Sequence, residues 1–213
     1  KKLADIFSIT FEDFLQEKEG TRVTVKVRGK KKKMQKIDSE IRINVPQEKV
    51  DKFRQVLFYI LKKIGGKPNV GMTVLYKLLY FIDFNFYEKY EEQLIGATYI
   101  KNNYGPTPKE FVKIIAEMDG KDLIKVKDKY FQYPQTKYLP RRPADLTKLK
   151  AHEVKVIDEV LENLSDKNAN QISEYSHNDV PWLTTQDGCV IDYESVFYRT
   201  APYSVRTYHE QDI

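Results

Sequence analysis

The stretch Lys77-Leu78-Leu79-Tyr80-Phe81-Ile82-Asp83-Phe84, followed by Tyr99-Ile100-Lys101-Asn102-Asn103-Tyr104-Gly105-Pro106-Thr107-Pro108, decides the fold of this chain. The first part is the centre of a predicted helix over 73–90, with apolar or aromatic side chains around most of its circumference. Such a helix belongs in the interior of a domain, so we expect it to be the central element. The second part predicts a turn. After it, Thr107-Pro108-Lys109-Glu110 has the pattern of a capping box with proline at the first helical position, which predicts a helix start there.

Asp83 is the one acid within the apolar run 77–84. A buried carboxylate must be paired or must accept hydrogen bonds. We expect it to accept them from a neighbouring loop, such as the backbone around Tyr104-Gly105. No second titrating group is in view, so general acid–base chemistry is not expected here.

The sequence from residue 47 onward predicts a mainly α fold of the α+β class. Before the central helix, a core-facing stripe predicts a helix from Gln47 that ends at Gly65-Gly66-Lys67-Pro68; its members are Phe53, Val56, Leu57, Ile60, Leu61 and Ile64. Two short strands around Lys127-Asp128-Lys129 predict a β-hairpin wing within 123–133, followed by a loop over 134–143. Further on, the pattern predicts helices at about 150–164, 170–177 and 193–200, with Pro181-Trp182 in a loop.

The N-terminal part has a different pattern. Residues 1–15 resemble the closing helices of a Cro/repressor-type helix-turn-helix domain, whose recognition helix would then lie upstream of residue 1. Alternation in 22–28 and 37–45 predicts a small β arm, and the basic run between them is interpreted as a solvated turn, with phosphate contact as the alternative. We therefore expect three parts: 1–20 from a helix-turn-helix domain, 21–50 as β arm and linker, and 51–213 as the main domain.

Composition limits the function classes. The 213 residues include 36 basic and 31 acidic ones, and a net charge of +5 permits a nucleic-acid or acidic partner without requiring one. No apolar run is long enough to cross a membrane, and no signal peptide is evident. The single cysteine, Cys189, cannot form an internal disulfide, which is typical of a cytoplasmic protein, and we interpret it as a small core hydrophobe and not as a nucleophile paired with His177. The histidines do not have metal-ligand spacing, and no phosphate-binding glycine motif occurs, so no metal, cofactor or catalytic residue is predicted.

The segments Lys77–Asp83 and Tyr104–Pro108 together resemble the signature of the Panacea family, the SocA-like antitoxin domain of bacterial toxin–antitoxin operons. Ser176–Trp182 resembles the family's Ser-His and Pro-Trp element, and the resemblance covers about residues 52–200. Ile82 is a mild departure, since a small residue is expected there. The resemblance implies a non-enzymatic helical domain with a cognate toxin as partner. It assigns a structural role to ten motif residues: Lys77, Leu79, Tyr80, Asp83, Tyr104, Gly105, Pro106, Pro108, His177 and Trp182.

Fifteen tyrosines are an unusual number for this length, and exposed tyrosines are effective protein contacts. The candidate partner-binding residues cluster towards the C-terminus: Tyr193, Phe197, Tyr198, Arg199, Tyr203 and Arg206. The leading hypothesis is an antitoxin that binds its toxin directly, with operator DNA bound through the upstream part. The alternatives are a winged-helix-like transcription regulator using residues 53–133, an adaptor that delivers a toxin to a protease, and an enzyme using Asp83 and His177. A homodimer is compatible with each of them.

Overall fold

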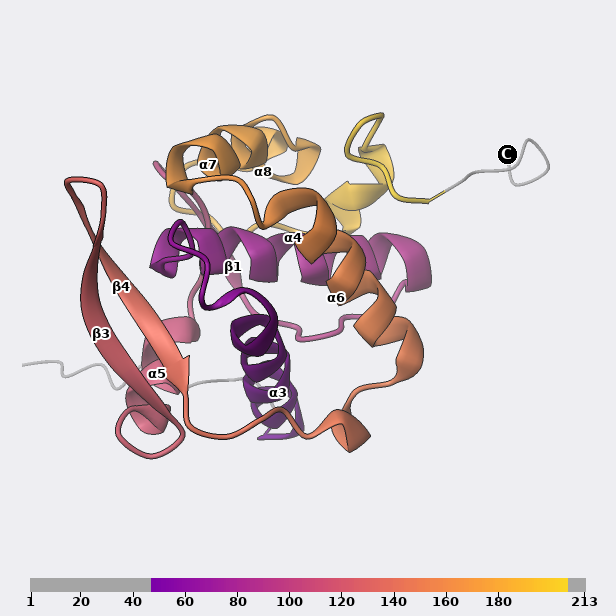
Figure 1. Ribbon diagram of the computed structural model, residues 1–213. Helices are drawn as coiled ribbons and strands as arrows, with labels where there is room; N and C mark the ends of the chain where they lie inside the picture. The colour runs from indigo at the N-terminus through magenta and orange to yellow at the C-terminus, as the bar shows by residue number, and fades with distance from the viewer. Residues whose placement is uncertain (1–46, 207–213) are drawn as a thin grey trace, which may run out of the picture. The chain divides into compact units, whose positions relative to one another are not determined.

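A computed structural model describes residues 47–206 (Figure 1). The helix-turn-helix resemblance of 1–15 and the predicted strands 22–28 and 37–45 lie outside the described residues. Within them the chain is mainly helical, with two small antiparallel β-hairpins. The predicted α+β, mainly α fold class is therefore confirmed.

Helix α4 (Met72–Tyr90) is the centre of the fold, as its sequence predicts. Every residue from Val74 to Phe84 is buried. The helix contacts α6, α7, strand β2 and the C-terminal 3-10 helix. Figure 1 shows it running across the middle of the molecule, with the other helices arranged around it. All its faces are covered, which explains why no polar face appears in its sequence.

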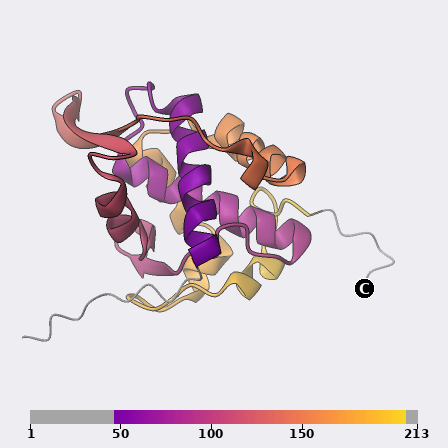
Figure 2. The same ribbon diagram turned by 90° about the horizontal axis from the view of Figure 1, so that it is seen from below.

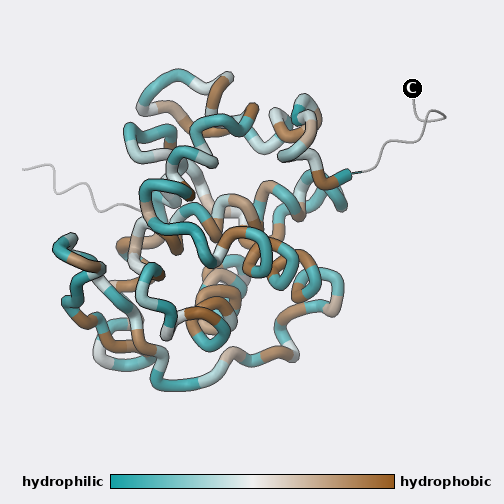
Figure 3. The backbone as a smooth tube through the Cα atoms, turned by 45° about the horizontal axis from the view of Figure 1, so that its top comes forward, coloured by the Kyte–Doolittle hydropathy of each residue, from teal (hydrophilic) through white to brown (hydrophobic). Residues whose placement is uncertain are grey.

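Helix α3 (Gln47–Ile64) crosses α4 and buries the predicted stripe (Figure 2). Helix α3 also contacts α6 (Ala151–Leu164), through packing and through several polar pairs. Lys52 Nζ lies 2.6 Å from the Glu153 carboxylate, and the Tyr59 hydroxyl donates to Asp158 at 2.9 Å. Hydrophobic segments gather where the helices meet, as the brown parts of the tube in Figure 3 show. The predicted helices at 47–64 and 150–164 are thus confirmed.

The predicted helix start at Thr107–Glu110 is wrong. Tyr99–Asn102 (β1) and Gly105–Pro108 (β2) form a hairpin instead, and helix α5 begins only at Phe111 and runs to Met118. The carboxylate of Glu110 accepts a hydrogen bond from the Thr98 amide at 2.9 Å, so it does not close a capping box. Strand pairing has overridden the local capping signal, and the two prolines are tolerated because β2 lies at the edge of a two-stranded sheet.

The wing exists, but the sequence misplaces its turn. Leu123–Tyr130 (β3) and Tyr133–Pro140 (β4) pair over their whole lengths, and the chain reverses at Phe131-Gln132. The prediction of a turn at Lys127–Lys129 and of a loop over 134–143 is therefore wrong. Prolines 134 and 140 suggested a loop, yet they lie near the ends of β4, where a strand tolerates them. We call β3 and β4 with their turn the wing from here on.

The last part of the chain returns to α4. After the 3-10 turn η1 (Leu146–Lys148) and α6 come α7 (Ala169–His177), α8 (Val180–Thr184) and the 3-10 helix η2 (Tyr193–Tyr198). The expected loop around Pro181-Trp182 is a short helix, since proline suits the first helical turn. The helices predicted at 170–177 and 193–200 are found, the latter as a 3-10 helix that ends at Tyr198.

Candidate protein-interaction site

Asp83 is fully buried, and its carboxylate joins α4 to the loop that follows it. It accepts hydrogen bonds from the amides of Ile95 at 2.9 Å, Gly96 at 3.0 Å and Ala97 at 3.2 Å, and from the Tyr193 hydroxyl. Burial raises the pKa of Asp83, and these hydrogen bonds oppose the rise. The prediction of a hydrogen-bonded buried acid is confirmed, but the donor loop is 95–97 and not Tyr104-Gly105.

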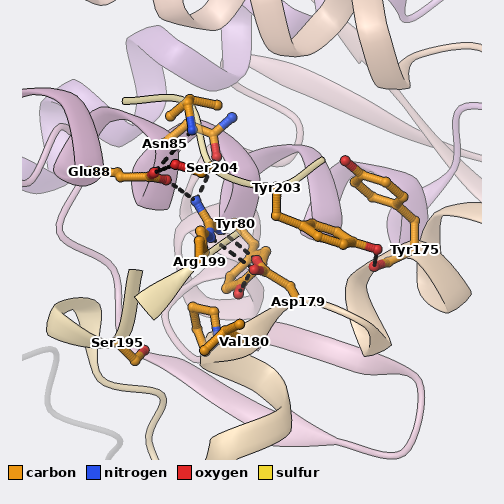
Figure 4. Close-up of polar contacts among 12 residues, drawn as sticks. Tyr80, Asn85, Glu88, Tyr175, Asp179, Val180, Ser195, Arg199, Tyr203 and Ser204 are labelled. Atoms are coloured by element: carbon orange, nitrogen blue, oxygen red, sulfur yellow. Dashed lines mark hydrogen bonds and ion pairs between the residues drawn. The ribbon is translucent and has the colours of Figure 1, made fainter. Parts of the chain in front are cut away.

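A second buried network joins α4 to the start of α8 and to the end of η2 (Figure 4). The Tyr80 hydroxyl donates to Asp179 at 2.8 Å, and the guanidinium of Arg199 makes a two-pronged pair with the same carboxylate. Arg199 Nη1 also donates to Glu88 at 3.0 Å and to Asn85 at 2.9 Å. Burial disfavours the charged guanidinium, but the neighbouring Asp179 and Glu88 carboxylates outweigh it, so the pKa of Arg199 is raised.

The other carboxylate oxygen of Glu88 holds the segment that follows Arg199. It accepts hydrogen bonds from the Ser204 hydroxyl at 2.6 Å and from the Val205 amide at 3.0 Å (Figure 4). Each charge of this network therefore meets opposite charge or hydrogen-bond donors, as a buried charge requires. The network fixes residues 199–205 onto α4.

The structure does not bring the candidate partner-binding residues together on one surface. The Arg199 side chain is fully buried, so it is not a surface contact. Tyr193 donates to Asp83, and the Tyr203 hydroxyl donates to the Tyr175 carbonyl at 3.0 Å. Phe197 is half-buried against Tyr87. Arg206 lies 2.6 Å from Glu91, whereas Tyr198 is 77% exposed. Among the described C-terminal aromatics, Tyr193, Phe197 and Tyr203 thus pack against the interior, whereas Tyr198 is exposed.

Lys77 connects α4 to the segment Tyr104–Pro108. Its buried ammonium donates to the Pro106 carbonyl at 3.0 Å, and burial lowers its pKa to about 7. Gly105 is required beside it, since its φ is +93° and a Cβ there would lie 2.7 Å from Lys77 Cε and would also overlap Ser176. On the same helix, the Leu79 carbonyl accepts from the Tyr99 hydroxyl at 2.9 Å. Lys77 and Leu79 of α4 are therefore both fixed to the β1–β2 hairpin.

We expect Lys77→Met to change how stability depends on pH. The folded pKa of about 7 lies below the ordinary 10.5, so between these values the unfolded chain binds the proton more tightly. The contribution of Lys77 to the free energy of unfolding therefore rises with pH from about 7 to about 10. The melting temperature of the wild type minus that of Lys77→Met should therefore increase with pH across this range. The same difference for the exposed Lys109→Met should stay constant. A difference in melting temperature between wild type and Lys77→Met that does not change with pH would contradict the lowered pKa of Lys77.

His177 and Trp182 stack on one another next to the hairpin. Their ring centroids are 4.3 Å apart, and Lys101 Nζ lies 4.0 Å above the Trp182 ring while donating to the Thr185 carbonyl at 2.8 Å. Burial and the charges of Lys77 and Lys101 lower the pKa of His177. Cys189 is exposed, so its interpretation as a core hydrophobe is wrong.

Three other strongly exposed aromatic residues lie away from the C-terminal cluster that the sequence predicted as the binding surface. Tyr104, part of the motif, is 79% exposed at the tip of the β1–β2 hairpin. On the wing, Phe131 is 80% and Tyr133 63% exposed. The sequence feature that could have indicated these exposed side chains is the run Tyr130-Phe131-Gln132-Tyr133. Its aromatic side chains cannot all face a core when the chain reverses there in a two-residue turn. Prediction placed the turn upstream and so assigned these residues to strand and loop.

A groove of about 720 Å³ lies beside these wing aromatics. Its walls come from the end of the wing, the first turn of α4 and the first turn of α7; they include Met72, Lys127, Tyr130, Phe131, Tyr133 and Ala169. Apolar and aromatic side chains share this lining with polar ones such as Asn69, Thr136 and Asn170. The groove is therefore a candidate binding site, and its exposed aromatic side chains suit a protein segment.

Two further findings concern residues 47–206. No group of three or more histidine, cysteine or acidic side chains is placed there to hold a metal ion. Within the same range, the helices are too short or too polar to cross a membrane.

The chain matches the model of a known protein family. The family model described as "Antitoxin SocA-like, Panacea domain" matches residues 75–183, which is about half of the chain and runs from α4 into α8. No curated protein matches the chain. The matched region contains the whole groove wall from the wing, the Lys77–Pro106 contact and the Asp83 carboxylate.

Proposed function

Because the chain belongs to the SocA-like Panacea family of antitoxin domains, we propose that it is an antitoxin that neutralises a cognate toxin by binding it directly. The family match carries this proposal. The structure supports it through two features: the central titratable groups are engaged with one another, and large aromatic side chains are presented on the wing. A rigid scaffold with exposed aromatic anchors is suited to binding a protein, since few side-chain rotors are frozen on association.

The finer parts of the proposal concern DNA and the location of the protein. We propose that the protein acts in the cytoplasm and that operator DNA is bound through the helix-turn-helix domain to which residues 1–20 are expected to belong. A DNA reader built from residues 53–133 has less support, because its central helix, α4, is buried and cannot enter a groove of DNA. An adaptor that delivers the toxin to a protease needs the same toxin-binding surface, so delivery to a protease is the alternative fate of the bound toxin.

Co-expression tests the proposal. The protein should relieve the growth arrest caused by the product of the adjacent gene, and the purified chain should retain that product on an affinity resin. Failure of both, with the chain folded and expressed, would contradict the proposal.

The same assay in a strain without its ATP-dependent proteases separates the two modes of action. Rescue that persists there indicates neutralisation by binding. Rescue that disappears, while the complex still forms, indicates an adaptor.

A further inference from the structure

The groove beside the wing is preformed, because strand β4 of the wing is hydrogen-bonded to the loop that precedes α4. Gln135 Nε2 donates to the Pro68 carbonyl at 2.8 Å, and Lys137 Nζ donates to the Lys67 carbonyl at 2.7 Å. Gly71 allows this approach, since a Cβ there would lie 2.9 Å from Gln135 Oε1. The wall formed by β4 is thus held against the loop that precedes α4. A partner would not have to order this part of the groove on binding.

The groove presents apolar side chains that no described part of the chain covers. Phe131 is 80%, Tyr133 63% and Met72 39% exposed. Phe131 also has a φ of +53°, an uncommon backbone conformation for a bulky residue. A glycine or asparagine would suit this turn better, so the aromatic ring is kept there at a cost in backbone energy. This arrangement favours an anchoring role for Phe131.

The charges around the groove favour an acidic partner. Lys127 lines it, and Lys129 lies two residues further along the same strand, whereas Lys125 is paired with Asp119. The first turns of α4 and α7 face the groove, and neither contains an acidic residue. Their amide ends therefore add positive potential. Asp128, the one acid of the lining, is tied to the neighbouring strand by the hydrogen bond that it accepts from Gln135 at 3.2 Å.

We propose that this groove binds an acidic segment of the toxin, with an aromatic or aliphatic side chain of that segment seated between Phe131, Tyr133 and Met72. The proposal rests on the proposed antitoxin function and names its binding surface. It places the contact on the wing and away from the C-terminal aromatics. Aromatic anchors supply most of the affinity in such interfaces, and Lys127 adds attraction at long range.

Photo-crosslinking tests the location directly. The chain is made with p-benzoylphenylalanine in place of Phe131, in place of Tyr198, or in place of Val112, an exposed residue of α5. It is then mixed with the purified product of the adjacent gene and irradiated. We expect a covalent complex from position 131 and none from 112 or 198. A complex from 198 alone, with none from 131, would overturn the proposal.

Affinity measurements on variants complete the test. Phe131→Ser with Tyr133→Ser should weaken toxin binding about tenfold or more, and Val112→Ser should leave it unchanged. Lys127→Glu should weaken it most at low salt, and acid-to-lysine changes in the crosslinked toxin segment should restore it. Unchanged melting temperatures keep loss of folding apart from loss of binding. If the wild type binds the toxin and the groove variants bind equally well, the groove proposal fails and the antitoxin function stands; if the wild type does not bind, both fail.

Discussion

Arg199→Met is expected to lower the free energy of unfolding by about 3–5 kcal/mol, the usual cost of removing one partner from a buried ion pair. The substitution leaves the carboxylates of Asp179 and Glu88 inside the domain without their shared cation. It also removes the donor that both carboxylates use, so hydrogen bonding is lost along with charge. Urea denaturation at neutral pH measures the change.

The matched control for Arg199→Met is Lys125→Met, which breaks an exposed pair with Asp119. Exposed pairs contribute at most about 1 kcal/mol, so this variant should remain close to the wild type. A loss below about 1 kcal/mol for Arg199→Met would show that the network relaxes or admits water, and that it does not fix the C-terminal segment.

Asp83→Asn is expected to cost about 2–3 kcal/mol, since charge-assisted hydrogen bonds are among the stronger ones and their buried donors would be left unsatisfied. The new amide can accept through one oxygen only, and its NH₂ group would face the amides of Gly96 and Ala97. Tyr193→Phe serves as the graded comparison. It removes one donor, leaves the three backbone donors of Asp83 in place, and should cost about 1 kcal/mol.

Thermal unfolding and the co-expression assay should be performed on the same Asp83→Asn variant. A melting temperature several degrees lower, with toxin neutralisation kept in the folded fraction, is the result that a structural role requires. Normal stability with lost neutralisation would instead assign Asp83 a functional role.

The helices were predictable because their signal is local and repeated. In α3 the apolar spacing fixes the buried face, and in α4 the absence of a polar face fixes its central position. The hairpins were predicted less well. Thr107–Glu110 has a good capping sequence, but pairing of Pro106 with Lys101 and the use of Glu110 by Thr98 depend on contacts that no local pattern records.

The buried charge network around Arg199 was even harder to predict, because its members are far apart in the sequence. Arg199 and Asp179 are twenty residues apart, and Arg199 and Glu88 more than one hundred. Considered locally, such charges are typical of a solvated surface, and Arg199 was assigned to one. Asp83 was predictable in kind, since an acid among aromatics must be satisfied, but its donors at 95–97 depend on the path of a loop.

The Glu88–Arg199–Asp179 contacts also bear on how such domains recombine in evolution. The recognisable signature ends at residue 183, yet two of its acids find their cation at residue 199. On the other side, α3 lies wholly before the signature and still fills the core. A genetic exchange cut at the edges of the signature would separate these partners. The structural domain is therefore longer than the segment that the family signature matches. We expect fusions to other domains to be joined before α3 and after the segment that Glu88 holds.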